Sequence, residues 1–379
     1  MIGAEAINMN QESISANFLR GVPAEEALTH LLPMVSEGYE KAIKRYGIEI
    51  LQYGHFSGFN RLREILAKTH NVASERLIVG NGGLEVISLF LKSLPRESLI
   101  FIEDTTYDRV IFDASQYGHK LIGITMTPEG LDLDELNRQL KRTSAAAFYG
   151  IPFHHNPTGI NYSMENRKAV EEICKKNGIL CAWDICYEAL RYDGKKNEPF
   201  TVAEWGPVLM NSFTKTISPG TKCGYIVLPK DRMEFMEKVV SNTRLNPNLP
   251  TQAFIADFIE SGKYKDYLQY LCNLYKPKMD ALNRSLKAHF PRTSPDRIAG
   301  GFFATITLKK ITRDREKSFI NAAKEAGVNI SDGWGTVAPN LLEEKYKEGL
   351  LIRLPFPACK TEQLEWGIQK LKELEETFK

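Results

Sequence analysis

Cysteine is scarce in this sequence. The 379 residues contain six cysteines, and no two of them form a Cys-x-x-Cys pair. Thiols this few and widely spaced do not suggest the disulfide framework of a small secreted domain. We expect all six to be reduced and the protein to be cytoplasmic. They are Cys174, Cys181, Cys186, Cys223, Cys272 and Cys359.

The sequence also has no marked excess of charge and no long apolar run. Lys plus Arg total 49 and Asp plus Glu total 47, which leaves a net charge of +2. This balance gives no reason to expect a nucleic-acid or membrane partner. No apolar run is long enough to cross a bilayer. The first ten residues, MIGAEAINMN, lack the basic and apolar regions of a signal peptide.

What is present is the composition of a large globular protein, with 43% hydrophobic and 25% charged residues. The chain is long enough for a large core and two domains. Short apolar runs alternate with segments of helical spacing, which is typical of an α/β fold.

Residues 212–224, SFTKTISPGTKCG, combine a lysine with hydroxyls and a turn. They follow a short apolar run at residues 207–210 that predicts a buried strand. A lysine in this setting can form a Schiff base with an aldehyde cofactor while its neighbours hold a phosphate. Most lysines are solvated surface groups, so this interpretation of Lys215 needs partners elsewhere in the chain.

Three further strand ends carry suitable partners. After a strand at residues 77–79, a glycine turn leads into a helix at residues 84–94, where the amides of Gly83 and Leu84 can meet a phosphate. A strand at residues 145–149 runs into the Asn156-Pro-Thr-Gly turn. A strand at residues 179–183 ends at Asp184, a carboxylate that can stabilise a positive charge on a bound cofactor. A plain turn at Asn156 and a helix-capping role for Asp184 are the alternatives.

Two histidines and one arginine complete the candidates. His154 and His155 have no Cys, Asp or Glu at ligand spacing, so we expect structural roles for both and no metal site. Arg353 lies in the apolar run at residues 350–355, which predicts that it points into a pocket. A guanidinium matches a carboxylate with two parallel hydrogen bonds, which a lysine cannot reproduce.

The order of these motifs resembles the fold-type I pyridoxal-phosphate (PLP) enzymes of the aspartate aminotransferase superfamily. Residues 212–224 are similar to its Ser-x-Ser-Lys-x-x-x-Pro-Gly-x-Arg-x-Gly motif, and residues 188–194 resemble the branch of 2-aminoadipate aminotransferases and MocR-type regulators. The resemblance implies a three-layer α/β/α PLP-transferase fold with a mostly parallel central sheet and a smaller α/β C-terminal domain. We expect an N-terminal arm and helix over residues 1–45, a large domain over 46–275 and a small domain over 276–379.

The resemblance also implies roles for individual residues. Lys215, Asp184 and Tyr187 would be catalytic. Arg353, Asn156 and Gly21 would bind the substrate, and Tyr53 would reach the cofactor phosphate of the partner subunit in a homodimer. The residues expected to bind PLP are Gly83, Leu84, Tyr107, Asn156, Asp184, Tyr187, Ser212, Lys215, Lys222 and Tyr53.

The predicted activity is amino-group transfer between an L-amino acid and a 2-oxo acid. Three residues depart from the family pattern: Lys222 replaces an arginine, Thr214 a serine and Thr105 a proline. Because a lysine lacks the guanidinium fork, the reaction type could differ. The alternatives are a PLP lyase, decarboxylase or other non-transaminating enzyme of specialised metabolism, and the effector domain of a MocR-like regulator. The short stretch before Tyr53 shows no helix-turn-helix pattern, which disfavours the regulator.

Two finer predictions concern local structure. Asp132 with Glu135, and Asp231 with Glu234, have the spacing of capping boxes at helix starts.

The pocket for the substrate side chain is expected to be formed by residues 10–25, 240–250 and 331–340.

Overall fold

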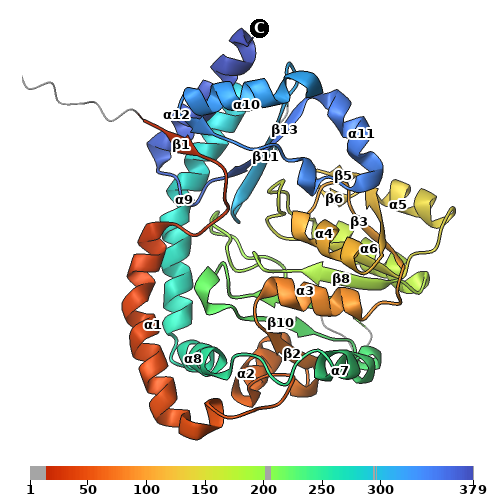
Figure 1. Ribbon diagram of the computed structural model, residues 1–379, viewed down its shortest axis with the longest axis vertical. Helices are drawn as coiled ribbons and strands as arrows, with labels where there is room; N and C mark the ends of the chain where they lie inside the picture. Colours follow the sequence, from red (N-terminus) through yellow and green to blue (C-terminus); the bar gives the residue numbers. More distant parts are fainter. Residues whose placement is uncertain (1–13, 201–205, 293–294, 296, 379) are drawn as a thin grey trace, which may run out of the picture.

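The computed structural model describes residues 14–200, 206–292, 295 and 297–378. Its centre is a seven-stranded sheet with the order β2-β10-β9-β8-β7-β3-β4 (Figure 1). All neighbouring strands run parallel except β10, which is antiparallel to both β2 and β9. The strands are β2 (Leu77–Gly80), β3 (Leu99–Glu103), β4 (Lys120–Ile124), β7 (Ala147–Gly150), β8 (Leu180–Asp184), β9 (Val208–Ser212) and β10 (Gly224–Val227).

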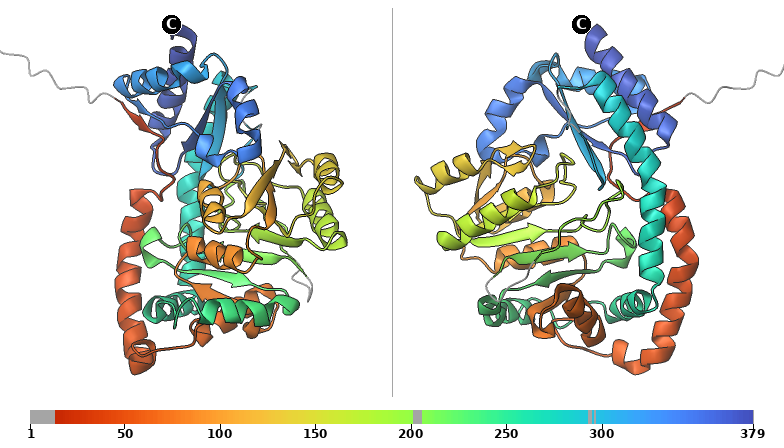
Figure 2. Two further views of the ribbon diagram at one scale, coloured as in Figure 1. Left: turned by 45° about the vertical axis from the view of Figure 1, so that its right-hand side comes forward. Right: turned by 180° about the vertical axis from the view of Figure 1, so that it is seen from behind.

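The apolar runs of the sequence become these strands because helices cover the sheet on both sides. Every residue of β2, β7 and β10 is buried. Parallel crossovers are right-handed, so connections that run in opposite directions along the sheet lie on opposite faces. Helices α3 (Gly83–Lys92) and α4 (Asp108–Gln116) therefore lie on one face, and α5 (Leu133–Leu140) and α6 (Met164–Lys176) on the other (Figures 1 and 2). The predicted three-layer architecture is confirmed.

The capping predictions have different outcomes. Asp132 accepts a hydrogen bond from Glu135 N at 2.9 Å and caps α5. The Glu135 carboxylate, however, accepts from Thr125 N. The pair Asp231 and Glu234 is wrong, because a 3₁₀ turn (Lys230–Arg232) precedes α7 (Met233–Ser241) and Arg232 occupies the N-cap position.

Two long helices lie side by side along one edge of the molecule (Figure 2). Helix α1 (Glu25–Tyr46) packs mainly on α8 (Leu249–Glu260), while α9 (Lys263–His289) continues from α8 toward the C-terminal elements and packs on α12 (Thr361–Thr377). Before α1, the short strand β1 (Ala16–Asn17) pairs with β12 (Val328–Asn329). The N-terminal segment thus contacts both parts of the fold, and the domain limits stay a prediction.

The C-terminal elements form a smaller α/β unit. Its antiparallel pair is β11 (Phe303–Leu308) with β13 (Leu350–Pro355), beside α10 (Glu316–Glu325) and the short α11 (Leu342–Lys345). A loop of this unit is joined to the end of β3, because Thr106 N donates to Thr336 O at 2.7 Å and Ala338 N donates to Asp104 O at 2.8 Å. These two hydrogen bonds hold in place the segment between the end of β3 and Tyr107. The remaining elements are α2 (Asn60–His70) and the hairpin β5 (Met126–Thr127) and β6 (Gly130–Leu131).

None of the helices in the described part of the chain is both long and apolar enough to cross a membrane. Nor do the described residues contain a group of three or more His, Cys, Asp or Glu side chains that could hold a metal ion.

Candidate active site

A cavity of about 420 Å³ opens at the carboxyl ends of the central strands. In an open α/β sheet this is the edge at which ligands bind. Of the site residues predicted from the sequence, all but Tyr53 line this cavity in one chain. These lining residues are Gly21, Gly83, Leu84, Tyr107, Asn156, Asp184, Tyr187, Ser212, Lys215, Lys222 and Arg353.

Lys215 projects into the cavity just beyond the end of β9. Its Nζ donates a hydrogen bond to the Gly21 carbonyl at 3.1 Å and lies 5.4 Å from the centre of the Phe302 ring. Burial lowers the pKa of the Lys215 amine. At a given pH, a larger fraction of the Lys215 amine is therefore neutral than for a surface lysine. The neutral amine is the nucleophilic form.

Asp184 is the last residue of β8 and is almost fully buried. The Tyr149 hydroxyl donates to its Oδ2 at 2.9 Å, and the Cys186 N–H donates to its Oδ1 at 3.1 Å. Burial raises the pKa of Asp184, while these two hydrogen bonds oppose the rise. The carboxylate is held in one orientation toward the cavity, where a cation would offset its desolvation.

The start of α3 and the turn after Lys215 form a polar cradle. Gly82, the N-cap residue of α3, has a φ of 105°, a conformation that favours glycine. A Cβ on Gly83 would lie 3.1 Å from the Ser212 Cβ, so bare backbone approaches the end of β9 closely. The Ser212 hydroxyl donates to Thr214 Oγ1 at 2.8 Å, and Lys222 lines the same end of the cavity. Backbone N–H groups, hydroxyls and one cation suit a phosphate.

Two side chains at the centre of the cavity come from different loops. Asn156 is buried, and its Oδ1 has no hydrogen-bond partner within the described residues. Tyr187 is buried, and its ring packs edge-on against Phe303 at 6.1 Å. Burial raises the pKa of Tyr187 well above its usual value. Both residues present polar groups that a bound molecule could satisfy.

Gly21 and Arg353 lie at the end of the cavity formed by the small unit. A Cβ on Gly21 would lie 2.2 Å from the Phe303 ring, so only glycine fits this close approach. The Arg353 guanidinium lies 5.1 Å from the centre of the same ring. It forms no ion pair within the part of the chain that the structure describes, so it is available for a carboxylate.

The two predicted histidines lie outside the cavity lining. His155 and Glu103 are fully buried, with Nε2 at 3.0 Å from Glu103 Oε2, although this contact is not aligned for a hydrogen bond. Burial lowers the pKa of His154 to about 3. His155 Nδ1 also lies 2.8 Å from Thr158 Oγ1 in the turn that follows, and a structural role for both histidines stays a prediction.

Tyr53 does not reach the cavity of its own chain. Its side chain is 76% exposed and lies in the loop between α1 and α2. Of the three segments predicted to supply the substrate pocket, the first contributes residues 19–22 to the cavity lining, and its residues 10–13 lie outside the described part of the chain. No described residue of 240–250 or 331–340 lines the cavity.

Several lining residues were not named as site residues from the sequence. Arg20 adjoins the predicted Gly21 and lies in the predicted segment 10–25, and Cys186 stands between Asp184 and Tyr187. Phe303 lies in a strand with no motif. The other lining residues that were not named as site residues are Leu19, Val22, Asn81, Gly82, Ile87, Asp108, Arg109, Ile151 and Thr214.

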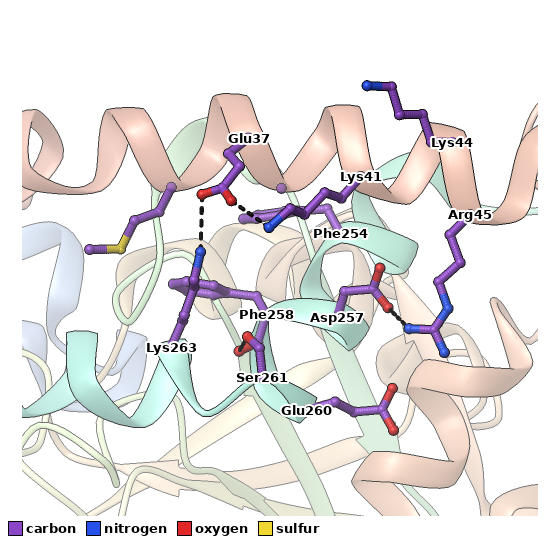
Figure 3. A pocket seen from close by; sticks show the side chains of 12 residues that line it. Glu37, Lys41, Lys44, Arg45, Phe254, Asp257, Phe258, Glu260, Ser261 and Lys263 are labelled. Carbon is purple, nitrogen blue, oxygen red and sulfur yellow. Dashed lines mark hydrogen bonds and ion pairs between the residues drawn. The ribbon is translucent and has the colours of Figure 1, made fainter.

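A second, larger cavity of about 620 Å³ lies between α1 and the helices α8 and α9 (Figure 3). Five of its charged side chains pair with one another, Glu37 with Lys41 and Lys263, and Arg45 with Asp257. Lys44 and Glu260 pair with Glu40 and Arg61, which lie outside the cavity lining. It contains none of the strand-end residues. The candidate active site is therefore the smaller cavity, where polar groups lack partners.

The sequence profile of aminotransferase class I and II matches residues 29–371. The chain belongs to the class I and II aminotransferases. It is 26% identical over 315 residues to an uncharacterized HTH-type transcriptional regulator, YisV, from Bacillus subtilis, with 81% of this chain and 64% of that protein covered. It is 23% identical over 387 residues to aromatic-amino-acid aminotransferase 1 from Thermococcus litoralis, with 97% and 90% covered.

Among solved structures, the fold is similar to LysN, an α-aminoadipate aminotransferase from Thermus thermophilus. The TM-score is 0.84 at 23% identity, and 96% of this chain and 92% of LysN are covered. That structure is complexed with N-(5'-phosphopyridoxyl)-L-leucine. The predicted family and PLP-transferase fold are confirmed.

The residues present fit PLP, the cofactor of this family. The glycine cradle with Ser212 and Lys222 suits a phosphate, the unpartnered Asn156 Oδ1 lies in a polar, buried position, and Asp184 supplies a carboxylate. Lys215 extends into the same space. Each chemical group of the cofactor thus has a matching group in one cavity.

Proposed function

We propose that this protein is a PLP-dependent aminotransferase that moves an amino group between an L-amino acid and a 2-oxo acid. The observation that carries the proposal is the placement of Lys215, with a lowered pKa, in the same cavity as Asp184 and the glycine cradle. When bound, PLP supplies an aldehyde that takes up the amino group and a ring that accepts negative charge.

The chain's own residues then have defined tasks. Lys215 holds the cofactor at rest and, once released, moves the proton at the substrate Cα. Asp184 would keep a proton on the ring nitrogen of the bound cofactor, and Tyr149 holds that carboxylate in place. Asn156 and Tyr187 would bind the phenolic oxygen of the cofactor, and Tyr107 would stack on its ring. Ser212, Lys222 and the amides of Gly83 and Leu84 would hold its phosphate.

At the substrate end, Arg353 would bind the α-carboxylate with both arms of its guanidinium, and Gly21 would leave room beside it. The absence of an ion-pair partner for Arg353 within the described residues supports this task. A fixed carboxylate orients the Cα–H bond toward Lys215, and such positioning is a large part of catalysis.

We further propose a homodimer in which Tyr53 completes the partner's phosphate site. The supporting observation is an exposed apolar surface around Tyr53, which includes Ile48 at 80% and Leu51 at 68% exposure. Leu245, also 68% exposed, lies in the loop that hydrogen-bonds Gly54 through Asn246. A second copy would cover such a patch. The six free thiols support the proposal of a cytoplasmic location.

The test is a panel of L-amino acids mixed with the PLP-loaded protein, followed by cofactor absorbance. Conversion to the aminated cofactor with release of a 2-oxo acid supports the proposal. Released ammonia or carbon dioxide would overturn it. Because a relative of greater length bears the name of a regulator, one further outcome is informative: amino-acid binding without any turnover would identify an effector domain instead.

A further inference from the structure

A largely buried ion pair lies next to the phosphate cradle. Arg244 Nη1 donates a hydrogen bond to Glu85 Oε2 at 2.7 Å, and the two side chains are only 9% and 27% exposed. Glu85 belongs to the first turn of α3, whereas Arg244 lies in the loop between α7 and α8. Neither residue lines the active-site cavity. The pair therefore acts on the cradle from outside the cavity.

Backbone carbonyls of two segments fix the Arg244 guanidinium in place. Its Nε and Nη2 donate to the Phe56 carbonyl at 3.2 and 3.0 Å, and Nη2 also donates to the Val79 carbonyl. Val79 precedes Gly80, the last residue of β2. A Cβ on Gly80 would lie 2.8 Å from Glu85 Oε2 and 3.5 Å from Arg244 Nη1. The ion pair thus packs directly on the turn that leads from β2 to α3.

Glu85 reaches the cradle through Asn81, which lines the cavity. The Glu85 carboxylate accepts hydrogen bonds from the Asn81 backbone N–H and, at 3.3 Å, from the Asn81 side-chain amide. Asn81 Oδ1 in turn accepts from Asn248 N at 2.9 Å. The first turn of α3 therefore holds a carboxylate close to the amides that suit a phosphate. A helix N-terminus attracts anions, but two anions at the same terminus repel one another.

We propose that Arg244 is a positioning residue for the cofactor phosphate, because its guanidinium neutralises Glu85 and fixes that carboxylate on Asn81. The proposal rests on the proposed function and adds a residue outside the cavity to its phosphate site. A phosphate of this kind carries about two negative charges at neutral pH, and Lys222 meets it as a point charge without a guanidinium fork. Without Arg244, the negative charge of Glu85 would offset the positive charge of Lys222.

The charge of Glu85 sets the size of the expected effect. An uncompensated carboxylate beside a bound phosphate corresponds to roughly a tenfold loss of affinity. Pyridoxal has the ring and the aldehyde of PLP but no phosphate, so the charge of Glu85 should hardly affect its binding. The ratio of PLP affinity to pyridoxal affinity therefore isolates the contribution of Arg244 to the phosphate site.

The test titrates PLP and pyridoxal into the cofactor-free protein and follows cofactor absorbance. Arg244→Met should weaken PLP binding roughly tenfold and leave pyridoxal binding almost unchanged. Combining Arg244→Met with Glu85→Gln removes both charges and should restore most of the PLP affinity. Glu85→Gln alone leaves Arg244 as an uncompensated cation, so this variant should bind PLP more tightly than the wild type.

Arg63→Met is the matched control. Arg63 is also partly buried beside β2, where it donates to the Leu77 carbonyl at 2.9 Å and to the Ser74 carbonyl at 2.8 Å. Leu77 is the first residue of β2, at the opposite end of the strand from the cradle. The loss of Arg63 should therefore lower stability without changing the ratio of PLP to pyridoxal affinity.

Two outcomes would overturn the proposal. One is an equal loss of PLP and pyridoxal affinity in Arg244→Met, and the other is a double variant that binds PLP as weakly as Arg244→Met does. Either result would show that Arg244 supports the fold and not the phosphate site through Glu85. Should Arg244→Met fail to fold, Glu85→Gln decides by itself: tighter PLP binding supports the proposal, and unchanged or weaker binding contradicts it.

These titrations need no turnover, so their result is independent of the amino-acid panel that tests the proposed function. If neither PLP nor pyridoxal binds, the proposed function itself fails. Isothermal titration with inorganic phosphate then decides the role of Arg244 in the same variants. Weaker phosphate binding in Arg244→Met, restored by Glu85→Gln, supports the role, and equal binding in all variants refutes it.

Discussion

Lys215 and Gly21 are 194 residues apart in the sequence, yet the Lys215 Nζ donates a hydrogen bond to the Gly21 carbonyl at 3.1 Å. The contact joins the turn after β9 to the segment that precedes α1. It therefore couples the residue that would carry the cofactor to the residues that would meet the substrate.

Gly21→Ala should disturb the Gly21–Lys215 contact. The added Cβ would lie 2.2 Å from the Phe303 ring, which is too close for an ordinary contact. We expect overpacking to lower the free energy of unfolding by about 1–3 kcal/mol, measured by denaturant titration. Gly335→Ala is the control, since its Cβ would meet no atom closer than 3.9 Å. Equal stability of the two variants would contradict the prediction.

Lys215 should carry the cofactor covalently. Borohydride reduction of the PLP-loaded protein, followed by peptide mapping, should place the label on Lys215, because its buried amine has a lowered pKa. Lys222 lines the same cavity and serves as an internal control. A label on Lys222 would refute the assignment.

Asp184→Asn should damage turnover far more than folding. The carboxylate stabilises a positive charge on the cofactor ring, and an amide of the same shape cannot. We expect kcat to fall roughly a hundredfold or more, while the melting temperature changes little. Steady-state kinetics and thermal unfolding of the same sample separate the two effects. Near wild-type turnover would show that the carboxylate has another task.

Acid should destabilise the fold partly through His70. Burial lowers the pKa of His70 to about 4 from 6.5, and its Nε2 lies 3.0 Å from the Tyr225 hydroxyl. Between these two pH values the unfolded chain binds more protons than the folded one. Stability therefore rises with pH through the window and is lost as pH falls. The effect amounts to roughly 3 kcal/mol at most.

The measurement is denaturant unfolding of wild type and His70→Gln across that pH range. The glutamine can keep a hydrogen bond to Tyr225 but does not titrate, so the stability of the variant should depend less on pH. Identical slopes in the two proteins would exclude His70 as a source of acid sensitivity.

Tyr53→Phe should weaken PLP binding without dissociating the proposed dimer. The hydroxyl should matter more than usual here, because Lys222 gives the phosphate a point charge and no fork. The sharper check mixes Tyr53→Phe with Lys215→Ala. In a mixed dimer, the intact Lys215 site receives Tyr53 from the Lys215→Ala chain, so its PLP affinity should return to the wild-type value. Persistent weak binding, or an active monomer, would refute the shared site.

The sequence by itself determined the buried strands and the order of polar residues at their ends. Parallel strands that are covered on both faces must be apolar. The apolar runs before Gly83, Asn156, Asp184 and Ser212 therefore predicted buried strands. Local rules also placed the cap at Asp132, whose side chain reaches a backbone N–H three residues away. These features depend on residues that are close together in the sequence, so the sequence pattern alone predicts them.

Only the tertiary structure decided which distant segments meet. Packing of the N-terminal segment and of the β11–β13 pair against the central sheet brings Gly21, Phe303 and Arg353 to the cavity of Lys215, and no spacing in the sequence encodes those distances. The same reason explains why Cys186 and Phe303 were not predicted as cavity residues. The cap predicted at Asp231 failed for a local reason, because a 3₁₀ turn over Lys230–Arg232 displaces the start of α7. The local sequence pattern predicts each helix and strand, whereas packing between the helices and strands decides which residues form the site.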